Sequence, residues 1–245
     1  GIANDHSIAW GIAKSLSDEG ASMYLTYQND SIKKRVEPLS KKINCLGIMP
    51  CDVSDTSSLE NVCNGIEGNI DFFVHAVAYS DKNELSGKYL NTTRENFLKT
   101  LHISAYSLTE MVRMLSPKMN DGASIMALTY YGSTRYMQSY NVMGVAKAAL
   151  ETSIKYLAVD MGDRGIRVNA ISAGPMRTLA GAVINKSRKI YNYTIENSPI
   201  KKPLSLEDIG KSSVYLMSDL SKGVTGEILY VDNGYNNVGM SIQDL

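Results

Sequence analysis

The sequence is poor in cysteine, has no long apolar run and carries no excess charge of either sign. Its three cysteines, Cys45, Cys51 and Cys63, form no CxxC pair, which argues against a disulfide framework or a zinc site and for a reducing compartment. No apolar run approaches the length of a membrane span. Twenty-five Lys and Arg balance twenty-five Asp and Glu, which argues against a broad basic surface for nucleic acid or anionic lipid. We therefore expect a cytoplasmic protein with no metal, nucleic-acid or membrane partner.

Repeats, low-complexity tracts and Pro/Gly-rich linkers are also absent. With 245 residues, the chain predicts a single domain over residues 1–245. The sequence opens at Gly1 in a loop-like segment, without an initiator Met or a preceding strand. We therefore expect a first strand before Gly1, and an upstream targeting segment stays an open alternative.

Short β-rich runs alternate with longer helical patterns along the whole chain. The expected strands are 23–27, 47–51, 71–76, 124–129, 167–172 and 227–231, and several are apolar without alternation, as in strands covered on both faces. One expected helix is capped by Ser7 and ends at Gly20, and the two longest cover 93–119 and 139–161. This order predicts an α/β fold, a doubly wound Rossmann domain with a mostly parallel seven-stranded sheet whose first strand precedes Gly1. Such sheets bind ligands at the carboxyl ends of their strands.

The segment GIANDHSIAWGIA, residues 1–13, is a glycine-started turn that leads into a helix N-terminus. Backbone N–H groups at such a terminus can face a pyrophosphate, although the spacing is not GxGxxG. Gly11 lies one turn into the helix, where a small residue permits close packing. A capped surface helix without a ligand is the alternative interpretation.

Three further strand ends favour a dinucleotide site. Gln28, Asn29 and Asp30 follow the strand where an adenine ribose would lie, and no Arg comes next, which favours NADH over NADPH although Lys residues are near. Asp52 ends the next strand, where its carboxylate could accept from an adenine amino group; a turn-initiating Asp is the alternative. His75 ends the third strand, before small residues, and we interpret it as structural because no partner carboxylate is nearby in sequence.

The stretch YNVMGVAK places a phenol, Tyr140, seven residues before an ammonium, Lys147. In a helix this spacing is close to two turns, so both side chains would project from one face, roughly 10 Å apart along the axis, and could hold one ligand. For the octapeptide alone, packing without a ligand is the alternative.

Tyr130 and Tyr131 bring two more phenols to the same edge of the sheet. After the next strand, Gly174-Pro175 forces a turn, and residues 176–178 can offer backbone and hydroxyl groups to a cofactor.

Together these segments resemble the NADH-dependent enoyl-acyl-carrier-protein reductases of type II fatty-acid synthesis. The resemblance rests on GIANDHSIAWGIA, TYQND, CDV, YNVMGVAKAALE, IRVNAISAGPMRTLA and GEILYVDNGY, and it covers nearly the entire chain. Ordinary short-chain dehydrogenases have a Tyr four residues before the Lys, where this chain has Met143. The resemblance implies reduction of a trans-2-enoyl thioester by NADH, with acyl carrier protein as the partner that carries the substrate and a homotetrameric assembly.

Carried over residue by residue, the resemblance makes Tyr140 the residue that binds the thioester carbonyl and Lys147 the residue that holds the nicotinamide ribose. Tyr130 matches the second active-site tyrosine, and Ser80 falls at a substrate-lining position. The matching cofactor contacts are Gly1, Ser7, Ile8, Gln28, Asp52, Val53, Val77, Lys147, Met176, Arg177, Thr178, Leu179 and Ala180.

This sequence departs from the family pattern at Ala76 and Ala78, where many members have Ser and Gly, and at Ser187, where an aromatic often lines the acyl pocket. We expect residues 179–200 to form a flap over the acyl chain, with basic residues toward the carrier protein; a solvated surface helix is the alternative. Two other functions stay open for the whole chain. They are a ketone-reducing short-chain dehydrogenase, disfavoured by Met143, and a cofactor-binding protein without turnover.

Overall fold

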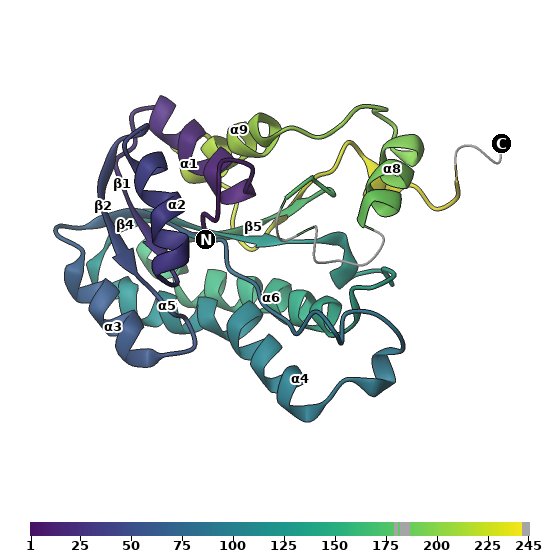
Figure 1. Cartoon of the computed structure of the whole chain (residues 1–245). Coiled ribbons are helices and arrows are strands. Elements are labelled where there is room, and N and C mark those ends of the chain that lie inside the picture. Colours follow the sequence, from purple (N-terminus) through teal and green to yellow (C-terminus); the bar gives the residue numbers. More distant parts are fainter. Residues whose placement is uncertain (179–180, 182–186, 242–245) are drawn as a thin grey trace.

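The computed structural model of the protein describes residues 1–178, 181 and 187–241. In this part of the chain, parallel strands alternate with helices (Figure 1). The strands are β1 (Met23–Tyr27), β2 (Cys45–Pro50), β3 (Ile70–His75), β4 (Met119–Thr129), β5 (Arg167–Ala173) and β6 (Ile228–Val231). The helices are α1 (Ile8–Asp18), α2 (Asp30–Ser40), α3 (Thr56–Gly65), α4 (Arg94–Leu101), α5 (Ser107–Leu115), α6 (Asn141–Asp160), α8 (Ser187–Asn197) and α9 (Leu206–Met217). The α/β class and all six strands predicted within the chain are confirmed.

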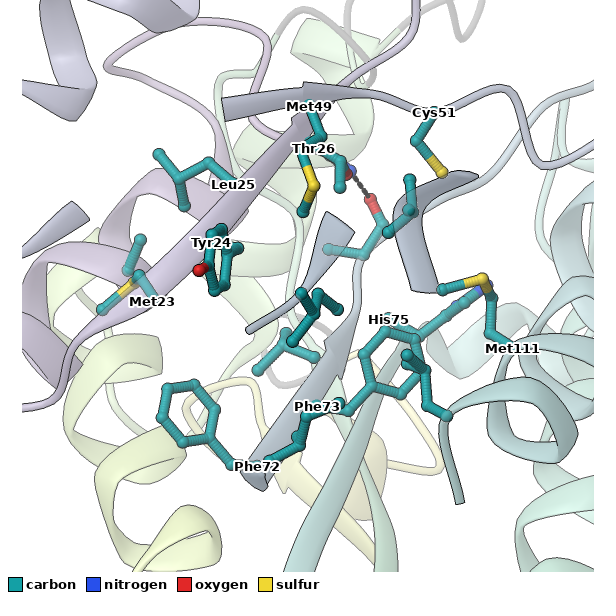
Figure 2. Close-up of a pocket in the computed structure, with 18 of the residues that line it drawn as sticks. Met23, Tyr24, Leu25, Thr26, Met49, Cys51, Phe72, Phe73, His75 and Met111 are labelled. Carbon is teal, nitrogen blue, oxygen red and sulfur yellow. Dashed lines mark hydrogen bonds between the residues drawn. The ribbon is translucent and has the colours of Figure 1, made fainter. Parts of the chain in front are cut away.

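The strands form two parallel ladders rather than one continuous sheet. β1 pairs with β2, and the second ladder has the order β3-β4-β5-β6. β1 and β3 are separated by an apolar cavity of about 250 Å³, lined by side chains of both strands and of neighbouring elements (Figure 2). Because no strand of the described chain lies between β1 and β3, the expected seven-stranded sheet appears here as six strands in two parts.

Helices cover both faces of the strands, as βαβ connections require. One core cluster joins α1, α2 and α9 to side chains such as Met126 and Ile171. Another joins α5 and α6 to side chains such as Ile125 and Val168. Adjacent residues Ile125 and Met126 thus point to opposite faces of β4, and both are fully buried. Within the described ranges, no helix is both long enough and apolar enough to cross a bilayer.

The long helix expected over 93–119 is interrupted. After α4 the chain forms a π-helical turn, η2 (His102–Tyr106), before it continues as α5. In this wider turn the Ser104 hydroxyl donates to the Tyr79 carbonyl and accepts from the Tyr79 amide, at 3.0 and 2.9 Å. The turn therefore connects the helix to the loop that follows β3, a contact between residues far apart in sequence that helical periodicity does not reveal.

Candidate active site

The sequence predicted a helix over 139–161 that includes Tyr140. In the structure, Tyr140 lies immediately before α6. Both neighbours have left-handed backbone conformations, with φ of 61° at Ser139 and 36° at Asn141. The Asn141 side-chain amide donates to the Glu84 carbonyl at 2.9 Å and ties this corner to the loop after β3. Non-glycine residues with positive φ are uncommon and cluster at functional sites, so this corner of the backbone is a candidate for a functional role.

Neighbouring rings and glycines fix the direction of the Tyr140 phenol. Its ring meets that of Tyr130 edge-on, with centroids 5.0 Å apart. A Cβ atom at Gly132 would lie only 2.6 Å from Tyr140 Cδ1, so glycine is required there for the ring to keep its place. Tyr140 is 9% exposed and also lines a groove that reaches the surface beside Tyr136. Burial, with Tyr130 and Glu151 nearby, raises the pKa of Tyr140 above its ordinary value, so the phenol stays protonated and can donate.

Lys147 is buried on α6 with its ammonium at the end of β4. Only 5% of the residue is exposed, and Nζ donates to the Leu128 carbonyl at 2.8 Å. Burial lowers the pKa of Lys147 to about 8, and the Glu151 carboxylate opposes this shift. An ammonium has three N–H donors, and one has a carbonyl partner among the described residues. The remaining donors fit the ribose hydroxyls of a dinucleotide, which is the role assigned from the resemblance.

The N-terminal cofactor segment lies at the same edge as the end of β3. The Gly1 nitrogen donates to the Ala76 carbonyl at 2.5 Å. Ser7 caps α1 as predicted, since its hydroxyl accepts from the Trp10 amide at 3.3 Å, and Ile8 packs on the core cluster of that face. A Cβ atom at Gly11 would lie 2.8 Å from Leu206 Cβ, which confirms close packing of α1 on α9.

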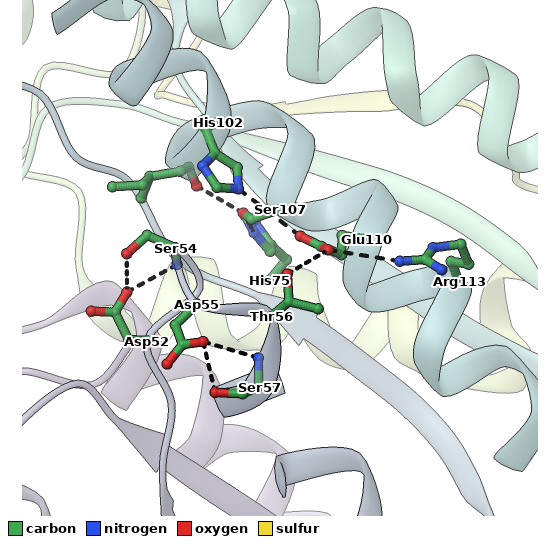
Figure 3. Close-up of polar contacts among 11 residues, drawn as sticks. Asp52, Ser54, Asp55, Thr56, Ser57, His75, His102, Ser107, Glu110 and Arg113 are labelled. Atoms are coloured by element: carbon green, nitrogen blue, oxygen red, sulfur yellow. Dashed lines mark hydrogen bonds and ion pairs between the residues drawn. The ribbon is translucent and has the colours of Figure 1, made fainter. Parts of the chain in front are cut away.

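Gln28 and Asp52 come together at the ends of β1 and β2. The Asp52 carboxylate accepts from the Ser54 hydroxyl and amide at 2.6 and 2.9 Å (Figure 3), a local turn like the one foreseen as the alternative role. These bonds hold the pKa of Asp52 below its ordinary value, and the Gln28 side chain adds to the effect. The other predicted contacts of this region, Val53 and Val77, pack in one apolar cluster.

Residues after β5 extend the site. Met176 packs on the core, and the Arg177 guanidinium lies over the ring of Tyr191 on α8, 4.7 Å from its centroid. The Thr178 hydroxyl accepts from the Gly181 amide at 2.9 Å. Two further predicted cofactor contacts, Leu179 and Ala180, lie outside the described residues.

Ser80 belongs to a hydrogen-bond network on the loop after β3. Its hydroxyl accepts from Thr100 Oγ1 at 3.0 Å and from Asn96 Nδ2 at 3.2 Å. The Asn96 side chain also binds the Asp81 amide and the Glu84 carboxylate. Ser80 therefore stabilises the loop whose Glu84 carbonyl binds the Asn141 side chain. Its predicted contact with substrate would come in addition to this role.

His75 is buried and takes part in packing at the end of β3. Its Nε2 lies 2.8 Å from Ser107 Oγ, and Ser107 donates its own proton to the Ile103 carbonyl (Figure 3). Nε2 is therefore the protonated nitrogen, and Nδ1 has no partner among the described residues. Burial lowers the pKa of His75 to about 3, with a smaller effect from Lys147, so the ring is neutral at physiological pH.

Sequence reasoning missed three residues that the structure brings to Tyr140 and Lys147: Gly132, Asn141 and Glu151. Glu151 was detectable, because it is a carboxylate one turn after Lys147 on a helix face otherwise occupied by Leu150, Ile154 and Leu157. Gly132 acts by letting the Tyr140 ring approach its backbone closely, and Asn141 acts through its backbone conformation. Neither effect can be recognised from the spacing of residues in the sequence. Among the described residues, no group of three or more His, Cys, Asp or Glu could hold a metal ion.

The strand order, the capped helix at the ligand edge and the buried Tyr–Lys pair define a dinucleotide-binding reductase of the doubly wound class. The enoyl-(acyl carrier protein) reductase family matches residues 1–236, and the chain belongs to this family. It is 53% identical to NADH enoyl-acyl-carrier-protein reductase 1 of Rhizobium meliloti, over 100% of this chain and 91% of that protein.

Solved structures give the same result. An enoyl-acyl-carrier-protein reductase of Anaplasma phagocytophilum in complex with NAD has a TM-score of 0.95 and 50% identity, and covers 98% of this chain and 93% of its own. The enzyme of Bacillus cereus, solved with NADP+ and an indole naphthyridinone, has a TM-score of 0.95 and 41% identity over 98% of this chain and 95% of its own.

Proposed function

We propose that the protein reduces trans-2-enoyl thioesters, carried by acyl carrier protein, to acyl thioesters in fatty-acid synthesis, with NADH as the cofactor. The observation that carries the proposal is the burial of Lys147 on α6 and of Tyr140 immediately before it, with Met143 at the position where a ketone reductase of this fold has its Tyr. Family membership supports the same activity. Bound NADH supplies the hydride that reaches the β-carbon of the substrate.

Tyr140 provides the donor that this reaction requires. As the β-carbon is reduced, negative charge develops on the thioester carbonyl oxygen, and a fixed O–H donor stabilises it mainly in the transition state. The raised pKa of Tyr140 keeps its proton available across the neutral range. One such donor contributes about 3 kcal/mol, or roughly 10²-fold in rate.

Lys147 and Tyr130 position the reacting groups. Lys147 directs ribose hydroxyls and adds positive potential near the developing charge. Tyr130 restrains the Tyr140 ring through the edge-on contact, and the pKa of Tyr130 is itself raised, chiefly by burial. We assign the remaining cofactor contacts to the residues predicted from the resemblance, namely Gly1, Ser7, Ile8, Gln28, Asp52, Val53, Val77 and residues 176–180. Ser80 is assigned to the substrate side.

Residues 179–200 form the substrate flap in this proposal, within a single domain. In its described part, α8 presents Arg188 and Lys189 to solvent, and Tyr191 contacts Arg177 beside the cofactor segment. The basic side chains suit the acidic surface of a carrier protein. A comparison of carrier-protein and coenzyme A substrates in an Arg188→Glu, Lys189→Glu variant tests this, since only turnover of the carrier-protein substrate should fall.

The proposed assembly is a homotetramer. Five large apolar side chains are exposed on the adjoining elements α4, η2 and α6, namely Leu98, Tyr106, Val145, Tyr156 and Val159. Covering such a patch by another copy of the chain removes it from water. Sedimentation equilibrium gives the mass of the assembly directly.

We place the protein in the cytoplasm, a proposal supported by the absence of a disulfide among its three cysteines and by the use of NADH.

The deciding experiment is an assay of NADH oxidation with crotonyl-coenzyme A and with longer trans-2-enoyl thioesters, with NADPH tested side by side. A 3-oxoacyl thioester serves as the ketone substrate. We expect turnover with the enoyl substrates and NADH. A folded preparation that binds NADH but oxidises it with none of the enoyl thioesters would overturn the proposal, and turnover of the ketone alone would favour a carbonyl reductase.

A further inference from the structure

Glu151 is a buried carboxylate beside the catalytic pair that the reaction described above does not use. It lies one helical turn after Lys147 on α6 and is 9% exposed. Its Oε1 accepts a hydrogen bond of 2.6 Å from the Thr129 hydroxyl, at the last residue of β4. The preceding residue, Leu128, accepts from the Lys147 ammonium at 2.8 Å. Two consecutive residues at the end of β4 thus bind two oppositely charged groups from consecutive turns of α6.

A buried carboxylate at this position destabilises the folded protein unless neighbouring groups compensate its charge. Its helical neighbours Leu150 and Ile154 are fully buried and apolar, and an apolar side chain of similar size would pack there. Burying a charge costs several kcal/mol, of which one hydroxyl donor returns only a part. The nearby positive charge is that of Lys147, one turn earlier on the same helix, whose cationic form the Glu151 carboxylate favours.

The charge of Glu151 acts on both groups of the catalytic pair in the direction that the reaction needs. A nearby negative charge favours the cationic form of Lys147 and the protonated form of Tyr140. The other titratable groups around Lys147 do not replace it. His75 on β3 is neutral, and Tyr130 and Tyr140 are protonated phenols.

We propose that Glu151, held by Thr129, is a positioning residue that keeps Lys147 cationic over the working pH range. This inference rests on the role proposed above for Lys147. It assigns Glu151 no contact with substrate or cofactor, so its effect should appear in pH dependence rather than as an outright loss of activity.

The test is NADH affinity, measured by fluorescence from pH 6 to 10, for the parent, Glu151→Gln and Glu151→Asp. In the parent, affinity should fall as pH rises through about 8, where Lys147 loses its proton. Without the carboxylate, the midpoint should move down by roughly one pH unit, which makes the Gln variant about fivefold weaker than the parent at pH 8. The Asp variant keeps the charge and should return the midpoint toward that of the parent. Should the Gln variant fail to fold, Glu151→Met offers an apolar side chain of similar length, and the same shift is expected.

Asp160→Asn is the matched control, because it removes an exposed carboxylate from the far end of the same helix. Its midpoint should equal that of the parent. If the parent lost affinity near pH 8 and the Gln and Met variants lost it at the same pH, the role of Glu151 would be overturned. If the parent showed no loss of affinity between pH 6 and 10, the fault would lie with the role of Lys147 instead, so the two failures are distinguishable.

Discussion

The ring of Tyr140 meets the ring of Tyr130 edge-on, with centroids 5.0 Å apart and planes inclined by 72°. Such a pair contributes about 1 kcal/mol beyond the burial of its area and sets the orientation of both rings. Since Tyr140 precedes α6 and has left-handed neighbours on either side, packing rather than helical hydrogen bonding determines where its hydroxyl points. The position of the proposed catalytic donor is therefore sensitive to changes in the atoms around its ring.

Replacement of Tyr140 by Phe should lower kcat for crotonyl-coenzyme A by about tenfold to a hundredfold, because the transition state loses its O–H donor. The Kd for NADH should change little, since the phenol is assigned to the substrate. Steady-state kinetics and fluorescence titration measure the two effects. Tyr136→Phe is the matched control, as Tyr136 is 83% exposed and should keep parental kinetics. An unchanged kcat in Tyr140→Phe would contradict the assignment.

Replacement of Gly132 by Ala tests whether ring position matters without removing any polar group. The new methyl would lie 2.6 Å from Tyr140 Cδ1 and 2.9 Å from Cε1, so the ring must move. A displacement of about 1 Å at a reacting group can cost up to a hundredfold, and we expect kcat to fall by roughly tenfold or more. Gly162→Ala, where no atom lies within 4 Å, is the control for the loss of a glycine. Full activity of Gly132→Ala would show that the rigid placement of Tyr140 is unnecessary.

Replacement of Lys147 by Ala should weaken NADH binding by about tenfold to a hundredfold, the effect of losing hydrogen bonds from a charged donor. Calorimetry at pH 7 measures the change, and the thermal midpoint of each protein checks its folding. Lys155→Ala removes an exposed Lys from the same helix and should bind NADH like the parent. Equal NADH affinity of Lys147→Ala and the parent would refute the role in ribose binding.

The strands could be predicted because they depend on local sequence. β1 has the predicted bounds, and β5 extends one residue beyond them, since apolar runs between turn residues define buried strands well. The seven-residue gap predicted that Tyr140 and Lys147 project from one helix face, whereas in the structure Lys147 lies on α6 and Tyr140 immediately precedes it.

Features that depend on contacts distant in sequence could not be predicted. The break at η2 is tied to the contact of Ser104 with Tyr79, 25 residues away. The boundary of α6 moved past Tyr140 because Asn141, with its positive φ, binds the Glu84 carbonyl from another loop. The cavity between β1 and β3 reflects which strands pair, and strand order is a property of the whole sheet.

His75 predicts a loss of stability in mild acid. Burial lowers its pKa from 6.5 to about 3 in the folded protein. In the unfolded chain His75 takes up a proton below about pH 6.5, so between pH 6.5 and 3 the unfolded state binds more protons and stability falls as pH falls. At pH 5 the contribution amounts to about 2 kcal/mol.

His75→Gln removes this titration and keeps a donor for Ser107. Urea unfolding at pH 7 and pH 5 should show a free-energy loss for the parent that exceeds the loss for the variant by about 2 kcal/mol. His6→Asn is the control, because the side chain of His6 is 75% exposed and should leave the pH dependence unchanged. Equal losses in the parent and in His75→Gln would mean that the ring accepts a proton in the folded state, since a water or a backbone shift would then satisfy the protonated Nδ1. The acid sensitivity of this fold would in that case come from its carboxylates rather than from His75.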